Sequence, residues 1–299
     1  MCGILGFVSK NTIGNQKATT MLLNGYTAQS DRGQQSFGAL IGKNGKMVVI
    51  KKLSITDFIK KFALNKFKDI NLCMFHHRMA SVGEISQENT HPFIAGDICL
   101  VHNGTWIDSM MFRDDFINEL TGTTDSEIIA HMINKYGVNA FKEISGSASL
   151  VWVNKKESTL NFWRTRTPMK LAYIKEREIL LFASTQEAIE AMVKTLGFKK
   201  VAGVFANYYI MDTEEEYLYK CNINFSSLYV EKVKKYPAGM SNLYNVFGNV
   251  NIFRNTIGRG GIKEKVKKVK LDHSYDCSLP QGYKWANSQP KSLFRDKKD

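Results

Sequence analysis

The hydrophobic pattern of the chain changes between two periods, one typical of strands and one typical of helices. Short apolar runs bounded by turn residues predict strands, and longer segments with apolar residues at every third or fourth position predict helices. Strands are expected at residues 4–8, 39–41, 46–53, 70–75 and 98–101, and then at 147–153, 159–163, 170–174, 179–183, 208–211, 216–220 and 228–234. Helices are expected at 15–30, from Thr56 or Asp57 to 68, and at 108–120, 126–136 and 186–196.

The order of these segments favours stacked sheets over a repeated strand–helix–strand unit. The chain begins with a strand, passes through helices and strands, and returns from about residue 146 to many short strands. Such an order predicts antiparallel sheets with helices on the outside. We therefore expect an α+β fold.

The composition is that of a folded protein with a sizeable core. The chain has 299 residues, 43% of them hydrophobic, and no apolar run reaches the roughly 18 residues that span a bilayer. The N-terminus lacks the basic and apolar regions of a signal peptide, so a cytoplasmic protein with no membrane partner is predicted. The five cysteines are scattered without a CxxC pair, which argues against a metal site or a disulfide framework.

The first residues carry the most specific candidate chemistry. Removal of Met1 would leave Cys2 with a thiol and a free α-amine in one residue. The reference pKa of such an amine is about 7.7 to 8.0, so near neutral pH it can accept the proton of the thiol. Gly3 has no side chain to obstruct a substrate. The alternative is a start methionine followed by a cysteine without a catalytic role.

Three later segments could complete a site for a small zwitterion. Arg78 follows a predicted strand, where its planar guanidinium could bind a carboxylate or be a solvated surface group. Asn103 and Gly104 could direct two N–H donors at one oxygen, as in an oxyanion hole, or form a simple turn. Asp125 could bind an ammonium group or be the N-cap of the helix that follows it.

Other polar or reactive residues near the predicted strands are interpreted as structural. His76 and His77 are adjacent at a strand end, so their side chains should point in opposite directions. Cys73 and Cys99 lie inside apolar runs and are interpreted as buried packing residues. None of these four residues is expected to react.

Nine short segments occur in a recognisable order over about the first 190 residues. They are residues 1–6, 32–33 with Ser36 and Gly38, 76–83, 89–93, 102–104, 124–127, 145–148, 164–169 and 182–184. Together they resemble the class II glutamine amidotransferase domain of the N-terminal-nucleophile hydrolase superfamily. Their likeness is greatest to the glutaminase domain of glucosamine-6-phosphate synthase.

The resemblance implies an αββα four-layer sandwich of two antiparallel sheets. It also implies an enzyme, a glutamine amidotransferase that acts on the side-chain amide of glutamine. Cys2 would attack this amide and form a γ-glutamyl thioester, which water then hydrolyses to glutamate. Asn103 and Gly104 would hold the oxyanion of the tetrahedral intermediate.

The same resemblance implies the residues that bind the substrate. Arg78 would bind the α-carboxylate of glutamine and Asp125 its α-ammonium, with Arg32 and Ser81 as further substrate-binding residues. The implied chemistry requires no metal and no cofactor. Ammonia would pass to a synthetase.

Three positions depart from the pattern of glucosamine-6-phosphate synthase. Met79 stands in place of a tryptophan, Val82 in place of a histidine, and Arg166 in place of a glycine. Met79 and Val82 flank Arg78, so the closing of the pocket over glutamine is the part of the resemblance that they affect most.

The C-terminal part of the chain is expected to be distinct from the rest. We assign residues 1–245 to the amidotransferase domain and residues 246–299 to a basic C-terminal extension. Only about 65 to 100 residues follow the part that resembles a glutaminase, which is too few for a domain that consumes ammonia, so a separate synthetase subunit is the expected partner. The net charge is +13, and residues 263–270 are strongly basic, with Tyr283, Trp285 and Phe294 following. Such a tail could bind nucleic acid, or pack on its own domain or on a partner subunit.

Two other functions remain open from the sequence. One is a stand-alone hydrolase of γ-glutamyl amides larger than glutamine, with Met79 and Val82 in an altered pocket. The other is a nucleic-acid-binding protein on a catalytically altered amidotransferase scaffold, which would use its basic tail. A glutaminase that supplies ammonia for the amidation of a modified base would combine both features.

Overall fold

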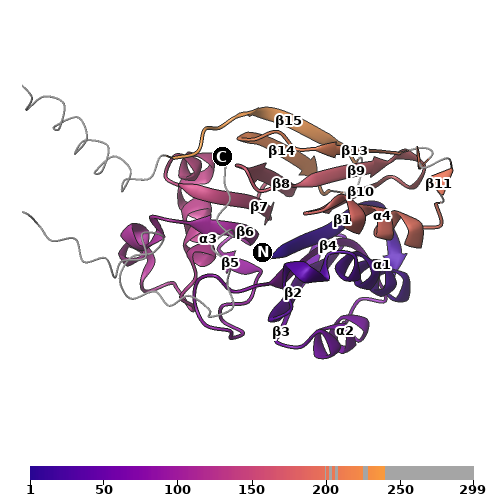
Figure 1. Cartoon of the computed structure of the whole chain (residues 1–299), viewed down its shortest axis with the longest axis horizontal. Helices are drawn as coiled ribbons and strands as arrows, with labels where there is room; N and C mark the ends of the chain where they lie inside the picture. The colour runs from indigo at the N-terminus through magenta and orange to yellow at the C-terminus, as the bar shows by residue number, and fades with distance from the viewer. Residues whose placement is uncertain (199, 202–203, 206–207, 225–227, 240–299) are drawn as a thin grey trace, which may run out of the picture.

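The computed structural model describes residues 1–198, 200–201, 204–205, 208–224 and 228–239, and shows two stacked sheets between helices (Figure 1). The first sheet has seven strands in the order β13-β9-β10-β1-β4-β2-β3, and neighbouring strands pair antiparallel. Its strands are β1 (Gly3–Gly14), β2 (Ser36–Lys43), β3 (Lys46–Lys52), β4 (Asp69–Arg78), β9 (Lys170–Ile174), β10 (Ile179–Ala183) and β13 (Tyr208–Asp212).

The second sheet has six strands in the order β15-β14-β8-β7-β6-β5, again antiparallel. Its strands are β5 (Phe93–Ala95), β6 (Ile98–Trp106), β7 (Gly146–Asn154), β8 (Thr159–Arg164), β14 (Tyr217–Asn222) and β15 (Val230–Lys235). A separate two-stranded ribbon pairs β11 (Lys200–Val201) with β12 (Val204–Phe205).

Helices cover the outer face of each sheet. The helices α1 (Asn15–Thr27), α2 (Ile55–Ala63) and α4 (Gln186–Thr195) pack on the first sheet, and α3 (Asp125–Tyr136) packs on the second (Figure 1). Short 3-10 turns connect the layers: η1 (Ser30–Arg32), η2 (Ser109–Phe112), η3 (Asp114–Phe116), η4 (Gly137–Lys142) and η5 (Lys175–Arg177). In the described part of the chain, none of the helices combines the length and apolar character that crossing a bilayer requires.

Strand alternation explains how the core divides into layers. Successive side chains of a strand point to opposite faces of the sheet. Along β1, Leu5 and Phe7 therefore pack against the helices, whereas Ile4 and Val8 pack against the second sheet. A third apolar cluster lies between the second sheet and α3. The α+β fold and the αββα four-layer sandwich are confirmed.

Several predicted boundaries are corrected by the structure. Residues 108–120 form the turns η2 and η3 instead of one helix, because their apolar residues do not share a buried face: Phe116 is buried, but Met111 and Ile117 are exposed. The N-cap of α2 is Ser54, whose Oγ accepts a hydrogen bond from the N–H of Asp57 at 3.4 Å, and not Thr56 or Asp57. The boundary at residue 245 and the extension 246–299 lie outside the described residues.

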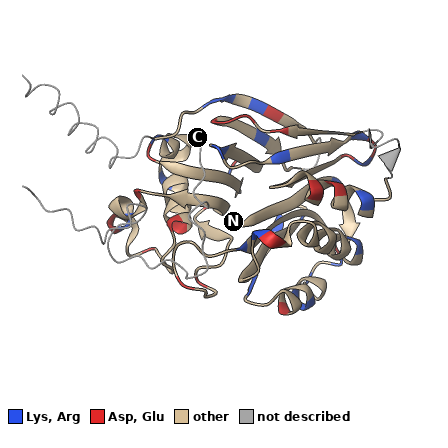
Figure 2. Ribbon diagram, viewed as in Figure 1, with Lys and Arg blue, Asp and Glu red and all other residues tan. Residues whose placement is uncertain are grey.

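Charge is distributed unevenly over the elements. Lys, Arg, Asp and Glu are frequent on outer elements such as α2 and β15, while the central strands of the second sheet are almost free of them (Figure 2). The sequences of β6 and β7 contain none of these four residue types. Few charged groups are buried in the interior, and Arg32, Arg78 and Asp125 are among them.

Candidate functional site

Strand alternation places three predicted site residues on the faces of the sheets that look toward each other. Cys2 is two residues before Ile4 at the start of β1, and Arg78 is four residues after Met74 on β4. The two members of each pair therefore point to the same face of the sheet. On β6, Asn103 shares its parity with Val101, which packs between the sheets. Because β6 contacts both β1 and β4 across the sandwich, we expect these side chains to converge at one end of it.

The backbone around Cys2 is held on two sides. The Arg32 Nε donates to the Cys2 carbonyl at 3.0 Å, which fixes the chain just before β1. The thiol lies 3.3 Å from the Met79 carbonyl oxygen and 3.4 Å from the Met79 nitrogen. Gly3 is required for a reason that the sequence did not reveal, since a Cβ there would strike the ring of His77.

Burial and the neighbouring groups have opposite effects on the pKa of the Cys2 thiol. Burial raises its pKa, which disfavours the thiolate. The hydrogen bond from Met79 and the positive charges of the Met1 amine, Arg78 and Arg32 lower the pKa of the thiol. The net shift is upward, so the thiol needs a base to become a nucleophile.

Asn103 and Gly104 lie within β6, which overturns the alternative that they form a turn. Asn103 is 2% exposed, and its Nδ2 is buried without a hydrogen-bond partner among the described residues. Such an unpaired buried donor is costly in a folded protein. It is therefore available to a ligand oxygen.

The ladder directs the N–H of Gly104 away from β7. Ala148 lies opposite Gly104, but its N–H and C=O both bond to Thr165 on the far side of β7. Residues opposite each other in such a pair direct their backbone groups outward. On the outward side of β6, the pairing with β5 covers residues 98–100 and ends before Gly104. The φ of +145° at Gly104 and the approach of Ser147 O both exclude a larger residue.

Arg78 is buried, so it is not a solvated surface residue. Its Nη1 donates to Glu84 O at 2.9 Å, and its Nη2 donates to Val82 O at 2.6 Å and Gly83 O at 3.2 Å. Burial lowers the pKa of Arg78, whereas the charges of Cys2 and Asp125 raise it. Arg78 is therefore close enough to both Cys2 and Asp125 to be affected by their charges.

Asp125 is buried but is not the N-cap of α3. Thr124 is the cap, because its Oγ1 accepts from the N–H of Glu127 at 3.3 Å. The carboxylate of Asp125 accepts from the N–H of Trp106 at 2.7 Å and from Ser126 Oγ at 3.2 Å. Trp106 follows Gly104 by two residues, so both backbone N–H groups leave the same side of β6.

Ser81 connects the segment after β4 to β6. Its Oγ lies 3.4 Å from Thr105 Oγ1, close to the oxyanion candidates. The structure therefore groups Cys2, Arg32 and Arg78 on one side with Asn103 and its neighbours on the other.

A buried histidine cluster supports this end of the sandwich, and the sequence did not reveal it. The rings of His76 and His91 stack with centroids 3.8 Å apart, and His76 Nε2 lies 3.1 Å from the His102 carbonyl oxygen. His102 Nδ1 in turn lies 2.9 Å from Ser126 Oγ. His77 points the opposite way, to Gly33 O at 2.9 Å, as alternation predicted. Cys73 and Cys99 are buried as expected.

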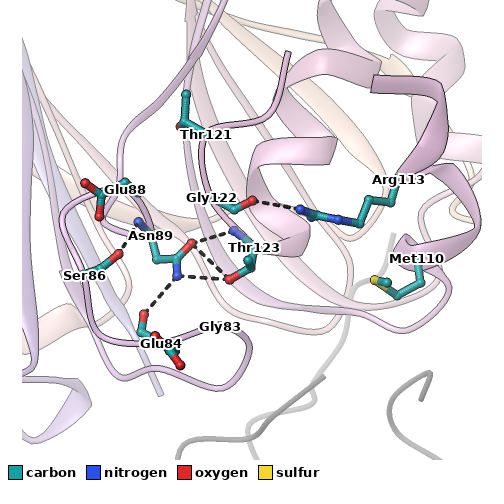
Figure 3. Close-up of a pocket in the computed structure, with 10 residues that line it drawn as sticks. All are labelled: Gly83, Glu84, Ser86, Glu88, Asn89, Met110, Arg113, Thr121, Gly122 and Thr123. Carbon is teal, nitrogen blue, oxygen red and sulfur yellow. Dashed lines mark hydrogen bonds between the residues drawn. The ribbon is translucent and has the colours of Figure 1, made fainter. Parts of the chain in front are cut away.

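A cavity of about 550 Å³ lies beside the loop that Arg78 holds (Figure 3). Figure 3 shows Gly83 and Glu84 on one wall and Thr123, two residues before Asp125, on another. Asn89 bridges these walls, since its Nδ2 donates to Glu84 O at 3.1 Å and its Oδ1 accepts from Thr123 N at 2.7 Å. The walls of the cavity are therefore formed by the loop that Arg78 binds and by the segment that precedes Asp125.

Comparison with known proteins gives matches to one family. Residues 76–191 match the family described as "Glutamine amidotransferase domain". The chain is 24% identical to the glutamine–fructose-6-phosphate aminotransferase (isomerizing) of Chlorobaculum tepidum over 92% of this chain and 47% of that protein. The enzyme of the same name from Wigglesworthia glossinidia brevipalpis is 32% identical over 54% of this chain and 26% of its own length. The chain thus spans at most about half the length of these relatives.

Solved structures agree at the level of the fold. The glutamine phosphoribosylpyrophosphate amidotransferase of B. subtilis superposes with a TM-score of 0.58 at 15% identity, over 82% of this chain and 52% of that one. A structure described as the allosteric regulatory enzyme of purine biosynthesis gives a TM-score of 0.57 at 17% identity, over 77% and 49% of the two chains. Sequence and fold thus agree: residues 76–191 match a glutamine amidotransferase domain family, and the stacked sheets have the fold of these two solved structures.

Proposed function

We propose that this protein hydrolyses the side-chain amide of glutamine through Cys2 and delivers the ammonia to a separate acceptor enzyme. The observation that carries the proposal is the convergence of Cys2, Arg78 and Asn103 at one end of the sandwich, in a chain that matches the amidotransferase family. The site combines a nucleophile, a donor for developing negative charge and a cation for a carboxylate.

In the proposed first step, the Cys2 sulfur bonds to the amide carbon of glutamine. The α-amine exposed by loss of Met1 takes the thiol proton, because burial keeps the thiol protonated near neutral pH. The charge that develops on the carbonyl oxygen is stabilised by Asn103 Nδ2 and the N–H of Gly104. Two such donors in a water-poor site are typically a large part of the rate enhancement.

In the proposed second step, the carbon–nitrogen bond breaks and the amine returns its proton to the leaving group, which departs as ammonia. A water molecule then attacks the γ-glutamyl thioester, the carbon–sulfur bond breaks, and glutamate and the free thiol are formed. Nothing in this sequence of steps requires an oxidant or a reductant.

The proposed substrate orientation follows from the two buried charges. Arg78 has five N–H donors, and the three contacts to the 82–84 carbonyls leave others for the α-carboxylate of glutamine. The carboxylate of Asp125 binds the α-ammonium. Ser81 and Arg32 complete the site, the latter by holding the Cys2 carbonyl.

The test is an assay of the purified full chain with glutamine, in which glutamate and ammonia are both measured. We expect equal amounts of the two products, and loss of both in Cys2→Ser. A chain that folds but releases neither product, alone or with candidate acceptor enzymes, would contradict the proposal. Release of glutamate from larger γ-glutamyl amides but not from glutamine would favour the stand-alone hydrolase instead.

A further inference from the structure

The positive charge of the described domain is concentrated on one edge. Residues 43–68 contain eight lysines and one acidic residue, Asp57. They form the end of β2, the edge strand β3, helix α2 and the turn into β4. The whole chain has a net charge of +13, so this short stretch carries about half of it.

We propose that this β3–α2 face, defined by Lys46, Lys60, Lys61, Lys66 and Lys68, binds the phosphate backbone of a nucleic acid. These five lysines are exposed and have no ion-pair partner among the described residues. By contrast, three of the four lysines on β14 and β15 are neutralised, as Lys220, Lys232 and Lys235 pair with glutamates 157, 214 and 216.

The length of the β3–α2 face fits an extended nucleic-acid backbone better than a small anion. From Lys46 to Lys52, β3 extends for roughly 20 Å. This length corresponds to about six base pairs of duplex, each strand of which carries one phosphate per 3.4 Å. Helix α2 packs beside β3 and carries Lys60 and Lys61 in its last turn; Figure 2 shows the blue positions of this helix at the bottom of the view. The face thus combines a lysine of the edge strand with lysines of the helix beside it and of the turn that follows.

The residue types favour a polyanion over a protein partner. Cores of protein interfaces are enriched in aromatic residues and arginine and depleted in lysine. Residues 43–68 contain no arginine, and their three phenylalanines at 58, 62 and 67 are buried. Lysine acts as a flexible point charge, which suits phosphate contacts but not base readout. The expected binding is therefore independent of base sequence.

Protection of the sheet edge explains only part of the pattern. Lysines on an edge strand prevent pairing with other chains, which accounts for Lys46 and Lys52 on β3. It does not account for Lys60, Lys61 or Lys66, which lie on α2 or after it and not on a strand. These lysines point to an external partner.

The test is fluorescence anisotropy of a labelled 30-base-pair duplex with the full chain between 50 and 200 mM salt. Two variants of equal net charge are compared. The face variant is Lys46→Gln, Lys60→Gln, Lys61→Gln and Lys66→Gln; the control is Lys142→Gln, Lys156→Gln, Lys175→Gln and Lys194→Gln, all exposed elsewhere. Glutamine hydrolysis and Tm should be unchanged in both, because all eight lysines lie outside the proposed site.

We expect the face variant to bind at least tenfold more weakly at 50 mM salt, with the salt slope smaller by up to about 3 to 4. The control should change affinity by less than threefold. Equal loss in both variants, unchanged binding by the face variant, or no DNA binding by the full chain would overturn the proposal. Binding to phosphatidylserine vesicles or to polyglutamate without binding to DNA would overturn the assignment of the partner.

Discussion

Cys2 lies where burial and nearby positive charge act against each other. Burial dominates and raises the thiol pKa, so the thiol is protonated near neutral pH. The proposed base is the neutral α-amine, whose reference pKa is about 7.7 to 8.0. We expect kcat/KM for glutamine to rise with pH between 6 and 8 as this amine loses its proton. A profile that is flat over this range, measured at constant ionic strength, would argue against the amine as base.

Asn103 gives the sharpest test of a single donor. Replacing it with alanine removes the unpaired Nδ2 but no hydrogen bond between described residues. We expect Asn103→Ala to lower kcat by about 10²–10³ with little change in KM, because the donor acts on charge that develops in the transition state. The control is Asn71→Ala, another buried asparagine, which bonds to Asn44 away from the site. A rise in KM without a fall in kcat would place Asn103 in substrate binding instead.

Arg78 is expected to determine the affinity for glutamine. Arg78→Lys keeps the charge but loses the fork that can bind a carboxylate and the 82–84 carbonyls together. We expect KM to rise at least tenfold, measured by steady-state kinetics. Arg164→Lys is the comparison variant, since Arg164 is hydrogen-bonded to Thr213 and is separated from Asn103 by the intervening strand β7. Similar KM changes in both variants would show a general structural effect.

The residue types alone were enough to name most of the candidate site. They were not enough to predict the buried contacts that hold it in place. Cys2 and Arg78 stand out because few residue types can be a nucleophile or a bidentate anion ligand. The contacts between His76, His91 and His102 could not be predicted, because they join three separate segments and have no characteristic spacing. For the same reason, the sequence did not show that Gly3 makes room for His77.

At the scale of elements, β4 and β6 are longer than their apolar runs. The sequence predicted strands at 70–75 and 98–101, whereas β4 reaches Arg78 and β6 reaches Trp106. Backbone pairing explains why both strands are longer than predicted. Strand β4 is paired on both sides, and β6 continues to pair with β7 as far as Gly146. Polar site residues inside strands are thus held by ladders instead of by loops.

The histidines on these elements should make stability depend on pH. Burial lowers the pKa of His77 to about 4 and those of His76 and His91 well below the usual value of 6.5. The unfolded chain then binds more protons below pH 6.5, so stability is highest above that pH and falls as pH decreases toward 4. His77 alone should cost about 2 kcal/mol of unfolding free energy between pH 7.5 and 5.

Urea denaturation at pH 7.5, 6 and 5 measures this loss. The variant His77→Gln, although less stable at pH 7.5, should lose less stability on acidification than the unaltered chain. A free energy of unfolding that stays constant from pH 7.5 to 5 would show that the histidines are not held neutral. Measurements stop at pH 5 to limit the contribution of carboxylates.

For the whole molecule, the layers could be predicted but the strand order could not. Alternation and the order of segments indicate stacked antiparallel sheets with outer helices. They do not indicate that β13 joins the first sheet while β14 and β15, next in the chain, join the second. Such assignments depend on which edges are open after the earlier strands have paired, which is a property of the assembled sandwich.

The position of the site within the chain predicts the effect of truncation. Every residue proposed for catalysis or glutamine binding lies between Cys2 and Asp125, and the described strands end with β15 at Lys235. We expect a chain ending at residue 245 to keep glutaminase kcat within about twofold and to bind DNA more weakly. An inactive truncated chain with an unchanged circular dichroism spectrum would show that residues 246–299 contribute to the site.

The central claim is that a terminal Cys2 is the nucleophile. Intact mass spectrometry of the purified chain, before and after reaction with a diazoketone analogue of glutamine, tests it most directly. We predict a chain that lacks Met1 and gains one adduct, located on Cys2 by peptide mapping and prevented by excess glutamine. Hydrolysis of glutamine by a chain that retains Met1, or an adduct on Cys73, Cys99, Cys221 or Cys277 in place of Cys2, would contradict the account.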